Sequence, residues 1–343
     1  MSNSDLAKAP RVGIAGYGLA GRYFHAPILA AAGFEIDSVL TKNPNRISEL
    51  HSDFPSARAV SDFDDLLKSN IDLLVVATSN DVHAEQAIAA LEAKIPVVVD
   101  KPMGRNLSET KQIISTAEKN KTAVTVYFNR LWDSDALTVK KIVADNLIGK
   151  VFRLESRFER FRPDLSANSW RENWSSEEGG GNLLDLQPHL ISTAIDWFGA
   201  AELVSASVRS IRGGSDDDIV LTLKHKSGVD SYLSASAIIG APGPRLRVSG
   251  DRGSLVINDL DPQENLLRNG YKPNAEGWPK GARSSAKIFT GDEVKDIQCE
   301  NGNYVSFYKK VKVGLQTGVM PISQELILQV AKIIDQAREI SIR

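Results

Sequence analysis

The chain has 343 residues, 42% hydrophobic and 24% charged, and its 41 Lys and Arg residues nearly balance its 43 Asp and Glu residues. This length predicts about two domains with a sizeable core, and the charge balance lacks the basic footprint of a nucleic-acid-binding protein. No apolar stretch reaches transmembrane length, the first ten residues lack a signal-peptide core, and the only cysteine, Cys299, excludes an intrachain disulfide. We therefore expect a cytoplasmic protein that binds neither nucleic acid nor membranes, with Cys299 in a structural role.

The first predicted strand, Val12–Ala15, leads directly into the run Gly16-Tyr17-Gly18-Leu19-Ala20-Gly21. This spacing is typical of a dinucleotide-binding turn. The first glycine allows a tight turn, the second lets backbone N–H groups approach a pyrophosphate, and the third allows close helix packing. Glycines also mark ordinary turns, but a helical stretch around Ile28 and a second strand, Ile36–Leu40, complete a βαβ unit. We expect dinucleotide contacts from Gly16, Gly18, Leu19, Ala20 and Gly21.

The end of the second strand bears on the choice of cofactor. An NAD site usually has a carboxylate there for the ribose 2′-OH, but the run from Leu40 to Arg46 contains none. Thr41, Lys42 and Arg46 are suited to hold a 2′-phosphate instead, which favours NADP over NAD. The alternatives are a solvated basic turn and a ribose contact from Asp37, although Asp37 falls inside the predicted strand.

The remainder of the first 128 residues alternates strands with helices. Continuous apolar strands such as Leu73–Ala77 indicate a parallel sheet covered on both faces, and the alternation predicts an α/β fold with a Rossmann dinucleotide-binding domain over residues 1–128. The other predicted strands here are Val97–Val99 and Thr122–Phe128, and the other helices are Ile47–Leu50, His83–Ala93 and Ser108–Lys119.

Two strand ends in this domain carry polar side chains. Groups just past the carboxyl ends of parallel strands line the ligand crevice, so we expect cofactor contacts from Thr78, Asn80, His83, Asp100 and Lys101. Alternatively, residues 79–81 only cap the following helix. Lys101 would lie near the nicotinamide, where its ammonium group can donate to a substrate oxygen, or else it is an exposed loop lysine.

Beyond residue 128 the pattern changes. A helix, Ser134–Asp145, and a strand, Val151–Phe158, precede several strands without helices between them, which predicts an α+β domain over residues 129–343 with a large, open, mostly antiparallel sheet. A second subunit is a suitable cover for such a sheet, so a homodimer or homotetramer is expected. We further predict a surface excursion over residues 259–285 and a C-terminal helix over residues 323–338 that packs back toward the first domain. The later strands are expected at Leu203–Ile211, Ile219–Lys224, Asp230–Ile239, Leu246–Ser249 and Ser254–Ile257.

Asp185 and His189 stand four residues apart, which places them on one side of a helical turn. Pro188 between them is acceptable only if a helix begins there. Histidine moves protons near neutral pH, and a nearby carboxylate can orient it or hold a substrate hydroxyl. Alternatively, Asp185 caps the helix and His189 is a core residue. A metal site is disfavoured, because no third ligand accompanies this pair.

These motifs, in this order, resemble the glucose–fructose oxidoreductase/inositol dehydrogenase (Gfo/Idh/MocA) family over essentially the whole chain. The resemblance is closest to its NADP-dependent scyllo-inositol dehydrogenase-like subgroup and rests on the segments 16–21, 24–27, 100–102, 129–135, 160–163, 185–189 and 302–304. It implies a Rossmann domain, an open-sheet domain that lines the substrate site, and a catalytic group formed by Lys101, Asp185 and His189. Asp100 stands where the family usually has Glu, and Pro188 where glycine is common.

Several further side chains are candidates for contact with a polyhydroxylated substrate. Asn129, Arg130 and Trp132 follow the end of the fifth predicted strand, and Arg160 belongs to a cluster of arginines and aromatic residues. Tyr304 is a further candidate, with simple packing as its alternative role.

Together these observations predict an NADP(H)-dependent oxidoreductase that interconverts a secondary alcohol and a ketone of a cyclic polyol or sugar. Two alternatives stay open. One is a related aldose dehydrogenase or ketose reductase with a different substrate, and the other is a nucleotide-binding regulator without turnover.

Overall fold

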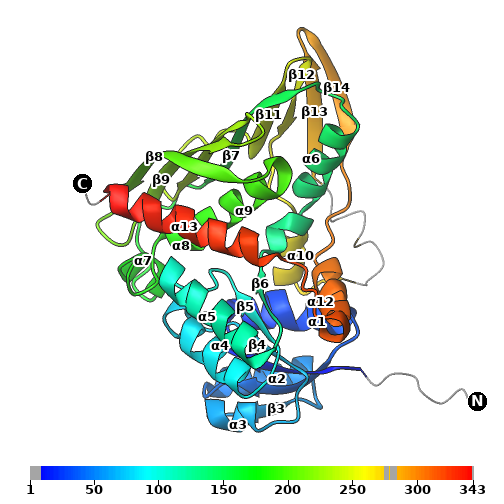
Figure 1. The fold of residues 1–343 in the computed structure, drawn as a ribbon, viewed down its shortest axis with the longest axis vertical. Coiled ribbons are helices and arrows are strands. Elements are labelled where there is room, and N and C mark those ends of the chain that lie inside the picture. The colour runs from blue at the N-terminus through cyan, green and yellow to red at the C-terminus, as the bar shows by residue number, and fades with distance from the viewer. Residues whose placement is uncertain (1–8, 274–277, 279–283, 342–343) are drawn as a thin grey trace, which may run out of the picture.

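The computed structural model describes residues 9–273, 278 and 284–341. Two β-sheets lie toward opposite ends of an elongated molecule, and the helix α13 crosses between them (Figure 1). Two of the predictions fall partly outside these residues, namely the start of the first domain and part of the excursion at 259–285.

The first sheet has six parallel strands in the order β3-β2-β1-β4-β5-β6, which confirms the predicted Rossmann topology. The central strand β4 is fully buried, as its continuous apolar sequence requires. The short elements β3 and α3 are not predicted from the sequence. The elements of this part are β1 (Arg11–Ala15), η1 (Ala20–His25), α1 (Ala26–Ala31), β2 (Glu35–Leu40), α2 (Pro44–Asp53), β3 (Arg58–Val60), α3 (Phe63–Leu67), β4 (Leu73–Val76), η2 (Asn80–Val82), α4 (His83–Glu92), β5 (Val97–Asp100), α5 (Leu107–Asn120) and β6 (Val124–Tyr127).

The glycine turn links β1 to the π-helical segment η1. Gly16 has φ +99°, and a Cβ there would lie 2.7 Å from the carbonyl oxygen of Ala77. A Cβ on Gly21 would lie only 2.0 Å from the carbonyl oxygen of Gly16, so the helix packs against the turn only because position 21 lacks a side chain. The first and third glycines are therefore required by the fold itself.

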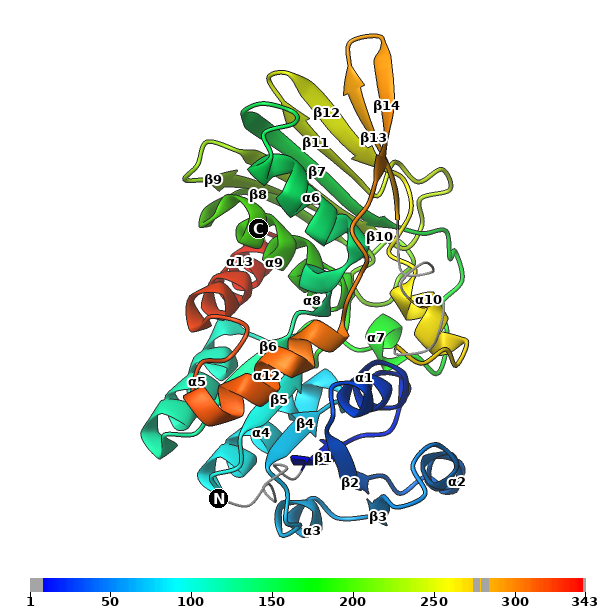
Figure 2. The ribbon, with the colours of Figure 1, turned by 90° about the vertical axis from the view of Figure 1, so that its right-hand side faces the viewer.

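The second sheet has eight strands in the order β14-β13-β12-β11-β7-β10-β9-β8, and it is mixed but mostly antiparallel, as predicted. Only the neighbours β7 and β10 run parallel. The helix α9 packs against β7 and β10 on one face, with α6 beside it (Figure 2). The elements of this part are η3 (Asn129–Trp132), α6 (Ser134–Ala144), β7 (Val151–Glu159), α7 (Trp170–Asn173), α8 (Asn182–Asp185), α9 (Gln187–Phe198), β8 (Ala201–Arg209), β9 (Asp218–His225), β10 (Asp230–Ser236), β11 (Leu246–Gly250), β12 (Gly253–Ile257), α10 (Gln263–Arg268), β13 (Ser285–Thr290), β14 (Glu293–Gln298), α12 (Val305–Thr317) and α13 (Gln324–Ser341).

The helix α13 contacts both parts of the molecule. It packs against α5 beside the first sheet and against α9 and β8 of the second part. Its buried residues Ile327, Val330 and Ile334 recur at helical spacing and form the apolar stripe that makes these contacts. The last helix therefore joins the two parts rather than covering only the first.

The segment at 259–285 departs from the predicted surface excursion. It contains the helix α10, and Asp261, Gln263 and Leu267 are each at most 3% exposed. The carboxylate of Asp261 accepts backbone N–H groups from Ser134 and Gln263, so this stretch is anchored in the core. The prediction is wrong at Asp261, Gln263 and Leu267, because polar side chains in this stretch satisfy buried backbone donors, but residues 268–272 are exposed, as expected.

Candidate active site

Lys101 and Asp185 meet where the two parts of the molecule face each other. The Nζ atom of Lys101, just past β5, donates to Oδ1 of Asp185 at 2.6 Å and to the Asp185 carbonyl oxygen at 2.7 Å. The Nε atom of Arg171 lies 3.4 Å from the same carboxylate oxygen. Burial acts to raise the pKa of Asp185, but the charges of Lys101 and Arg171 outweigh it and hold that pKa well below its usual range. The site therefore pairs a fixed ammonium group with an ionised carboxylate.

His189 lies on the next helical turn, but not in one continuous helix with Asp185. The helix α8 ends at Asp185, and α9 begins at Gln187 with Pro188 in its first turn. The helix start that Pro188 requires is thus present, and Asp185 and His189 belong to two successive helices separated at Leu186. Because a proline ring cannot continue a helix from the preceding turn, the break follows from the sequence.

The environment of His189 keeps its imidazole neutral. The side chain is 7% exposed, and its Nδ1 atom is buried without a hydrogen-bond partner among the described residues. Burial and the positive charges of Lys101 and Arg130 lower the pKa of His189 well below 6.5. A neutral imidazole next to an ammonium group is the form that accepts a proton from a hydroxyl.

His83 and Asp100 support the loop that carries Lys101. The ring nitrogens of His83 face the carbonyl oxygens of Pro102 (2.9 Å) and Thr78 (3.3 Å), and the residue is 1% exposed. This geometry contradicts the predicted contact of His83 with the cofactor, because both polar atoms of the ring face the backbone. Asp100 accepts the Lys101 backbone N–H at 2.9 Å.

A buried aromatic cluster formed by His25, Tyr127 and Tyr308 lies next to Asp100. His25 is fully buried, with Nδ1 at 2.6 Å from the hydroxyl of Tyr308 and Nε2 at 3.7 Å from Oδ1 of Asp100. Burial acts to raise the pKa of Asp100, but His25 and Lys101 outweigh it and lower that pKa to about 2. The glycine-turn helix and the Lys101 loop are therefore linked through His25 and Asp100.

Just past the end of β4, the side chains of Asn80 and Thr78 form hydrogen bonds within the protein. Asn80 is 6% exposed and donates its side-chain amide to the carbonyl oxygen of Gly179 at 2.8 Å, across to the second part of the chain. Thr78 donates to Oε1 of Gln86 at 2.9 Å. No side chain of residues 79–81 caps η2 or α4, so the capping alternative was wrong. Asn80 ties the two parts together, and Thr78 stays a candidate for cofactor contact.

Asp37 lies inside β2 and is excluded as a ribose ligand. It forms ion pairs with Arg11 and with Arg58, the latter at 3.0 Å, and its side chain is 8% exposed. Burial acts to raise the pKa of Asp37, but the two arginines lower it below its usual value. The carboxylate is therefore committed to holding β1, β2 and β3 together.

Of the predicted phosphate-binding residues, Arg46 lies beside the glycine turn. Lys42 and Arg46 are exposed and have no carboxylate partner among the described residues, whereas Thr41 is 7% exposed. A Cβ built on Gly18 would meet no atom closer than 3.7 Å, and that nearest atom belongs to the Arg46 guanidinium. The turn thus leaves open space in front of Gly18, with a cation beside it, which fits the phosphates of a dinucleotide.

Arg130 and Tyr304 belong to one buried polar network. Nη1 of Arg130 donates to the Tyr304 hydroxyl (3.2 Å) and to Asp133 (3.3 Å), Nη2 pairs with Glu264, and Tyr304 donates to Asp133 at 2.6 Å. Tyr304 is 1% exposed. Burial raises the pKa of Asp133 well above its usual value despite the charge of Arg130. These partners contradict a substrate contact for Tyr304 and make it a structural residue.

Of the other predicted substrate contacts, one is a core residue and two are partly exposed. Trp132 is 9% exposed and its ring packs edge-on against Phe307 at 5.3 Å, so it is a core residue and not a ligand contact. Asn129 and Arg160 are partly exposed. Burial and Arg162 lower the pKa of Arg160, while the nearby Asp185 raises it. No carboxylate pairs with Arg160 among the described residues, which keeps it as a candidate for substrate contact.

Three side-chain contacts in this region could not be predicted from the sequence. Arg171 contacts Asp185, while Asp133 and Glu264 complete the network around Arg130. Glu264 lies 134 positions from Arg130, so no local pattern signals the pair. Arg171 was noted within the arginine and aromatic cluster, but its carboxylate partner could not be inferred.

Other kinds of site are not supported by the described ranges. No group of three His, Cys, Asp or Glu side chains in them is arranged to hold a metal ion. None of their helices combines the length and apolar character needed to cross a bilayer. Cys299 is 2% exposed and lies in the hydrophobic core.

Comparisons with known proteins match both parts of the chain. A model of an oxidoreductase family with an NAD-binding Rossmann fold matches residues 10–128, and a GFO/IDH/MocA C-terminal domain matches residues 136–256. The chain is 31% identical to scyllo-inositol 2-dehydrogenase (NADP(+)) IolW of Bacillus subtilis, over 96% of this chain and 93% of the relative. It is 33% identical to the uncharacterized oxidoreductase YdgJ of Escherichia coli, over 95% and 94%. The structure of YPO2259 from Yersinia pestis superposes with a TM-score of 0.88 at 30% identity, covering 99% of this chain and 97% of the other.

Proposed function

The chain belongs to the GFO/IDH/MocA family of oxidoreductases, and from this premise we propose that it is an NADP(H)-dependent dehydrogenase. Its substrate is a cyclic polyol or sugar, on which it interconverts a secondary alcohol and a ketone. The observation that carries this proposal is the ion pair of Lys101 with Asp185 at the carboxyl end of the first sheet, with the neutral imidazole of His189 within electrostatic range of both. A nucleotide-binding regulator would need the glycine turn but no such proton-transfer group.

The cofactor fits the open glycine turn. Gly16, Gly18 and Gly21 would hold the pyrophosphate through backbone N–H groups, with Leu19 and Ala20 between them. Thr41, Lys42 and Arg46 would hold the 2′-phosphate, while Thr78 and Asp100 border the crevice. When bound, NADP supplies the hydride acceptor or donor, and all further steps belong to the protein. The NADP named for the relative IolW supports this choice over NAD.

The side chains divide the proton handling between them. In the oxidative direction, His189 accepts the proton of the substrate hydroxyl, and Lys101 donates a hydrogen bond to the same oxygen as negative charge develops on it. Asp185 fixes the ammonium group of Lys101 and accepts from a second hydroxyl. In the reductive direction, His189 returns the proton to the carbonyl oxygen.

The second part of the chain selects the substrate. Arg160 and Asn129 are the two predicted contacts whose side chains are neither buried in the core nor engaged by a carboxylate. Both carry donors suited to vicinal hydroxyls. The activity named for IolW makes a scyllo-inositol-like ring the first candidate.

The outer face of the second sheet is suited to contact with another copy of this chain. On this face the exposed Val220 and Tyr232 lie on the adjacent strands β9 and β10, and the charged Glu155, Arg157 and Arg247 lie on the neighbouring strands β7 and β11. Such a face supports the proposed homodimer or homotetramer. We also propose domains over residues 1–128 and 129–343, and a cytoplasmic location.

A substrate panel tests the proposed function. Purified protein is incubated with inositols, inososes, aldoses and ketoses, with NADP(H) and NAD(H) side by side, and absorbance at the reduced-nicotinamide band is followed. We expect turnover of a cyclic polyol with preference for NADP(H). Turnover of an open-chain sugar alone would favour the related aldose dehydrogenase or ketose reductase. Cofactor binding without turnover of any compound would favour the regulator.

A further inference from the structure

The contact between Lys101 and Asp185 joins segments that are 84 positions apart. Two loops lie next to it. One follows Lys101 and runs through Arg105, and the other, residues 175–181, leads into α8. Arg105 donates from Nη1 to the carbonyl oxygen of Glu177 at 3.2 Å, which is one direct tie between these loops.

Arg338 of α13 binds both loops with one guanidinium group. Its Nη2 atom donates to the carbonyl oxygen of Arg105 at 3.0 Å, and its Nε atom donates to the hydroxyl of Ser176 at 2.8 Å. The side chain is only 16% exposed. These contacts therefore lie within the junction and hold the Lys101 loop against the segment that precedes Asp185.

Asp335, one turn earlier on α13, completes this arrangement. Its Oδ1 accepts from Nη1 of Arg338 at 3.2 Å, and its Oδ2 accepts the backbone N–H of Leu107 at 2.9 Å. Leu107 begins α5, where the Lys101 loop ends. The pair thus orients the guanidinium and anchors the far end of the same loop.

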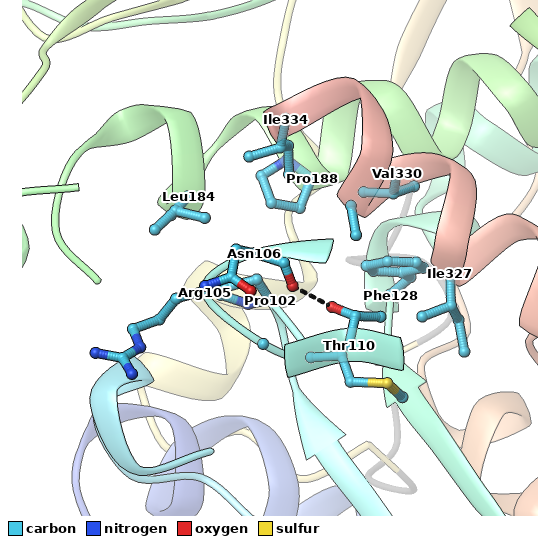
Figure 3. A pocket seen from close by; sticks show the side chains of 13 residues that line it. Pro102, Arg105, Asn106, Thr110, Phe128, Leu184, Pro188, Ile327, Val330 and Ile334 are labelled. Carbon is cyan, nitrogen blue, oxygen red and sulfur yellow. Dashed lines mark hydrogen bonds between the residues drawn. The ribbon is translucent and has the colours of Figure 1, made fainter. Parts of the chain in front are cut away.

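The apolar side of this junction is closely packed. Figure 3 shows Pro102 from the Lys101 loop, Leu184 and Pro188 from either side of Asp185, and Val330 and Ile334 from α13 around one pocket. The cavity measures about 10 Å³, room for one water molecule at most. The three segments therefore pack closely against one another. A substitution of Arg338 is expected to shift both loops, because close packing transmits displacement between them.

We propose that Arg338 is a positioning residue, which holds Lys101 and Asp185 in register by binding the loops that carry them. Its catalytic consequence rests on the proposed function. Arginine suits this position because the acceptors on Arg105, Ser176 and Asp335 are each bound by a different nitrogen of its guanidinium group. A planar guanidinium has five N–H donors for them, whereas a lysine ammonium is a single point with three.

The test compares Arg338→Ala with the wild type in steady-state kinetics. We expect kcat to fall about 10- to 100-fold, because small displacements of catalytic groups have effects of this size. The KM for NADP(H) should change less than about twofold, because the glycine turn is not touched. Arg338→Lys should recover part of kcat, and millimolar guanidinium should partly rescue Arg338→Ala. The matched control is Lys332→Ala, which removes an exposed positive charge from the same helix and should leave kcat unchanged.

A second measurement does not depend on turnover. Lys101 is labelled by limited reductive methylation of the whole protein, and its rate is followed by mass spectrometry. In Arg338→Ala we expect labelling of Lys101 to rise about fivefold, because its ion pair with Asp185 loosens, while exposed Lys111 is labelled as before. If the wild type turns over no compound, the proposed function fails, but this measurement still decides the positioning role.

Two results would overturn the proposal. One is that Arg338→Ala leaves both kcat and Lys101 labelling at wild-type values. The other is a lowered melting temperature with unchanged kcat for the folded fraction, which assigns Arg338 to stability alone. If Arg338→Ala does not fold, Arg338→Lys and Asp335→Asn take its place. If both of these variants have the kcat and the Lys101 labelling rate of the wild type, the positioning role is rejected.

Discussion

The ammonium group of Lys101 is bound by two oxygens of one residue, the carboxylate and the carbonyl of Asp185, at 2.6 and 2.7 Å. An ammonium group has three donors, so one N–H is left for a ligand. Because both acceptors come from the second part of the chain, the position of Lys101 depends on how the two parts meet. Five predictions follow from this relationship and from the surrounding geometry.

Replacing Lys101 by Met should lower kcat about 10²- to 10⁴-fold, because the hydrogen bond to the reacting oxygen is lost. Binding of NADP(H), measured by nicotinamide fluorescence, should persist. The control is Lys111→Met, an exposed lysine of α5. Near-normal turnover by Lys101→Met would remove Lys101 from the mechanism.

The acid limb of the pH profile should reflect His189. Its pKa is lowered in the folded protein, so the imidazole stays neutral as pH falls through 6.5. We therefore expect kcat/KM for oxidation to hold constant down to pH 6.5 and to decline only below it. His189→Gln should lower activity and abolish this limb. Below pH 6.5 the histidine binds a proton in the unfolded chain but not in the folded protein, where its pKa is lowered. The free energy of unfolding of the wild type should therefore decrease as the pH falls below 6.5. An acid limb centred above pH 6.5 would contradict this assignment.

The glycine turn offers a matched pair of substitutions. Gly21→Ala places a methyl group 2.0 Å from the Gly16 carbonyl oxygen. It should lower the free energy of unfolding by about 3 kcal/mol, because the packed turn must shift. Gly18→Ala has space around it and should change that free energy by less than about 0.5 kcal/mol, while weakening NADP(H) binding. Denaturant titration and fluorescence binding separate the two effects. If Gly21→Ala and Gly18→Ala change stability and NADP(H) binding to the same extent, then Gly21 is not specifically a packing position and Gly18 is not specifically a phosphate-binding position.

Lys42 and Arg46 should determine the preference for NADP. Replacing both by Ala should raise the KM for NADP about tenfold or more and leave the KM for NAD unchanged, because only NADP has the 2′-phosphate. The control is Lys68→Ala, an exposed lysine after α3. If the double variant loses affinity for both cofactors equally, these residues do not read the 2′-phosphate.

Tyr304→Phe distinguishes a structural role from substrate contact. It removes the hydroxyl that donates to Asp133 and accepts from Arg130, so a buried carboxylate loses a donor. We expect a destabilisation of about 1–3 kcal/mol by thermal or denaturant unfolding, with substrate KM changed less than about twofold. A large rise in KM at unchanged stability would return Tyr304 to the substrate site.

The centre of the first sheet could be predicted from the sequence because β4 and β5 are buried on both faces and read as continuous apolar runs. β13 and β14 could not. Nearly every residue of β14 is exposed, so no apolar alternation marks it, and its only partner is β13. The short strand β3 has only three residues, too few for any periodicity.

The candidate site divides in the same way. The motifs around Lys101 and Asp185 predicted two residues that the fold brings into contact, and His189 lies within electrostatic range of both, while the catalytic role of the three stays a prediction. The partners of Arg130 and of Arg338 lie far away in the chain, and only the packed structure reveals them. Tyr304 and Trp132 were misassigned because aromatic residues serve a core and a sugar site equally well.

The position of α13 has a consequence for synthesis. This helix lies C-terminal to every element that it joins, α5, α9 and β8. The first part of the chain is itself completed late, because Tyr308 of α12 lies in its buried aromatic cluster against His25 and Tyr127. Given the proposed role of Arg338, the register between Lys101 and Asp185 would be set only when α13 has docked, so the candidate site would be among the last features of the molecule to form.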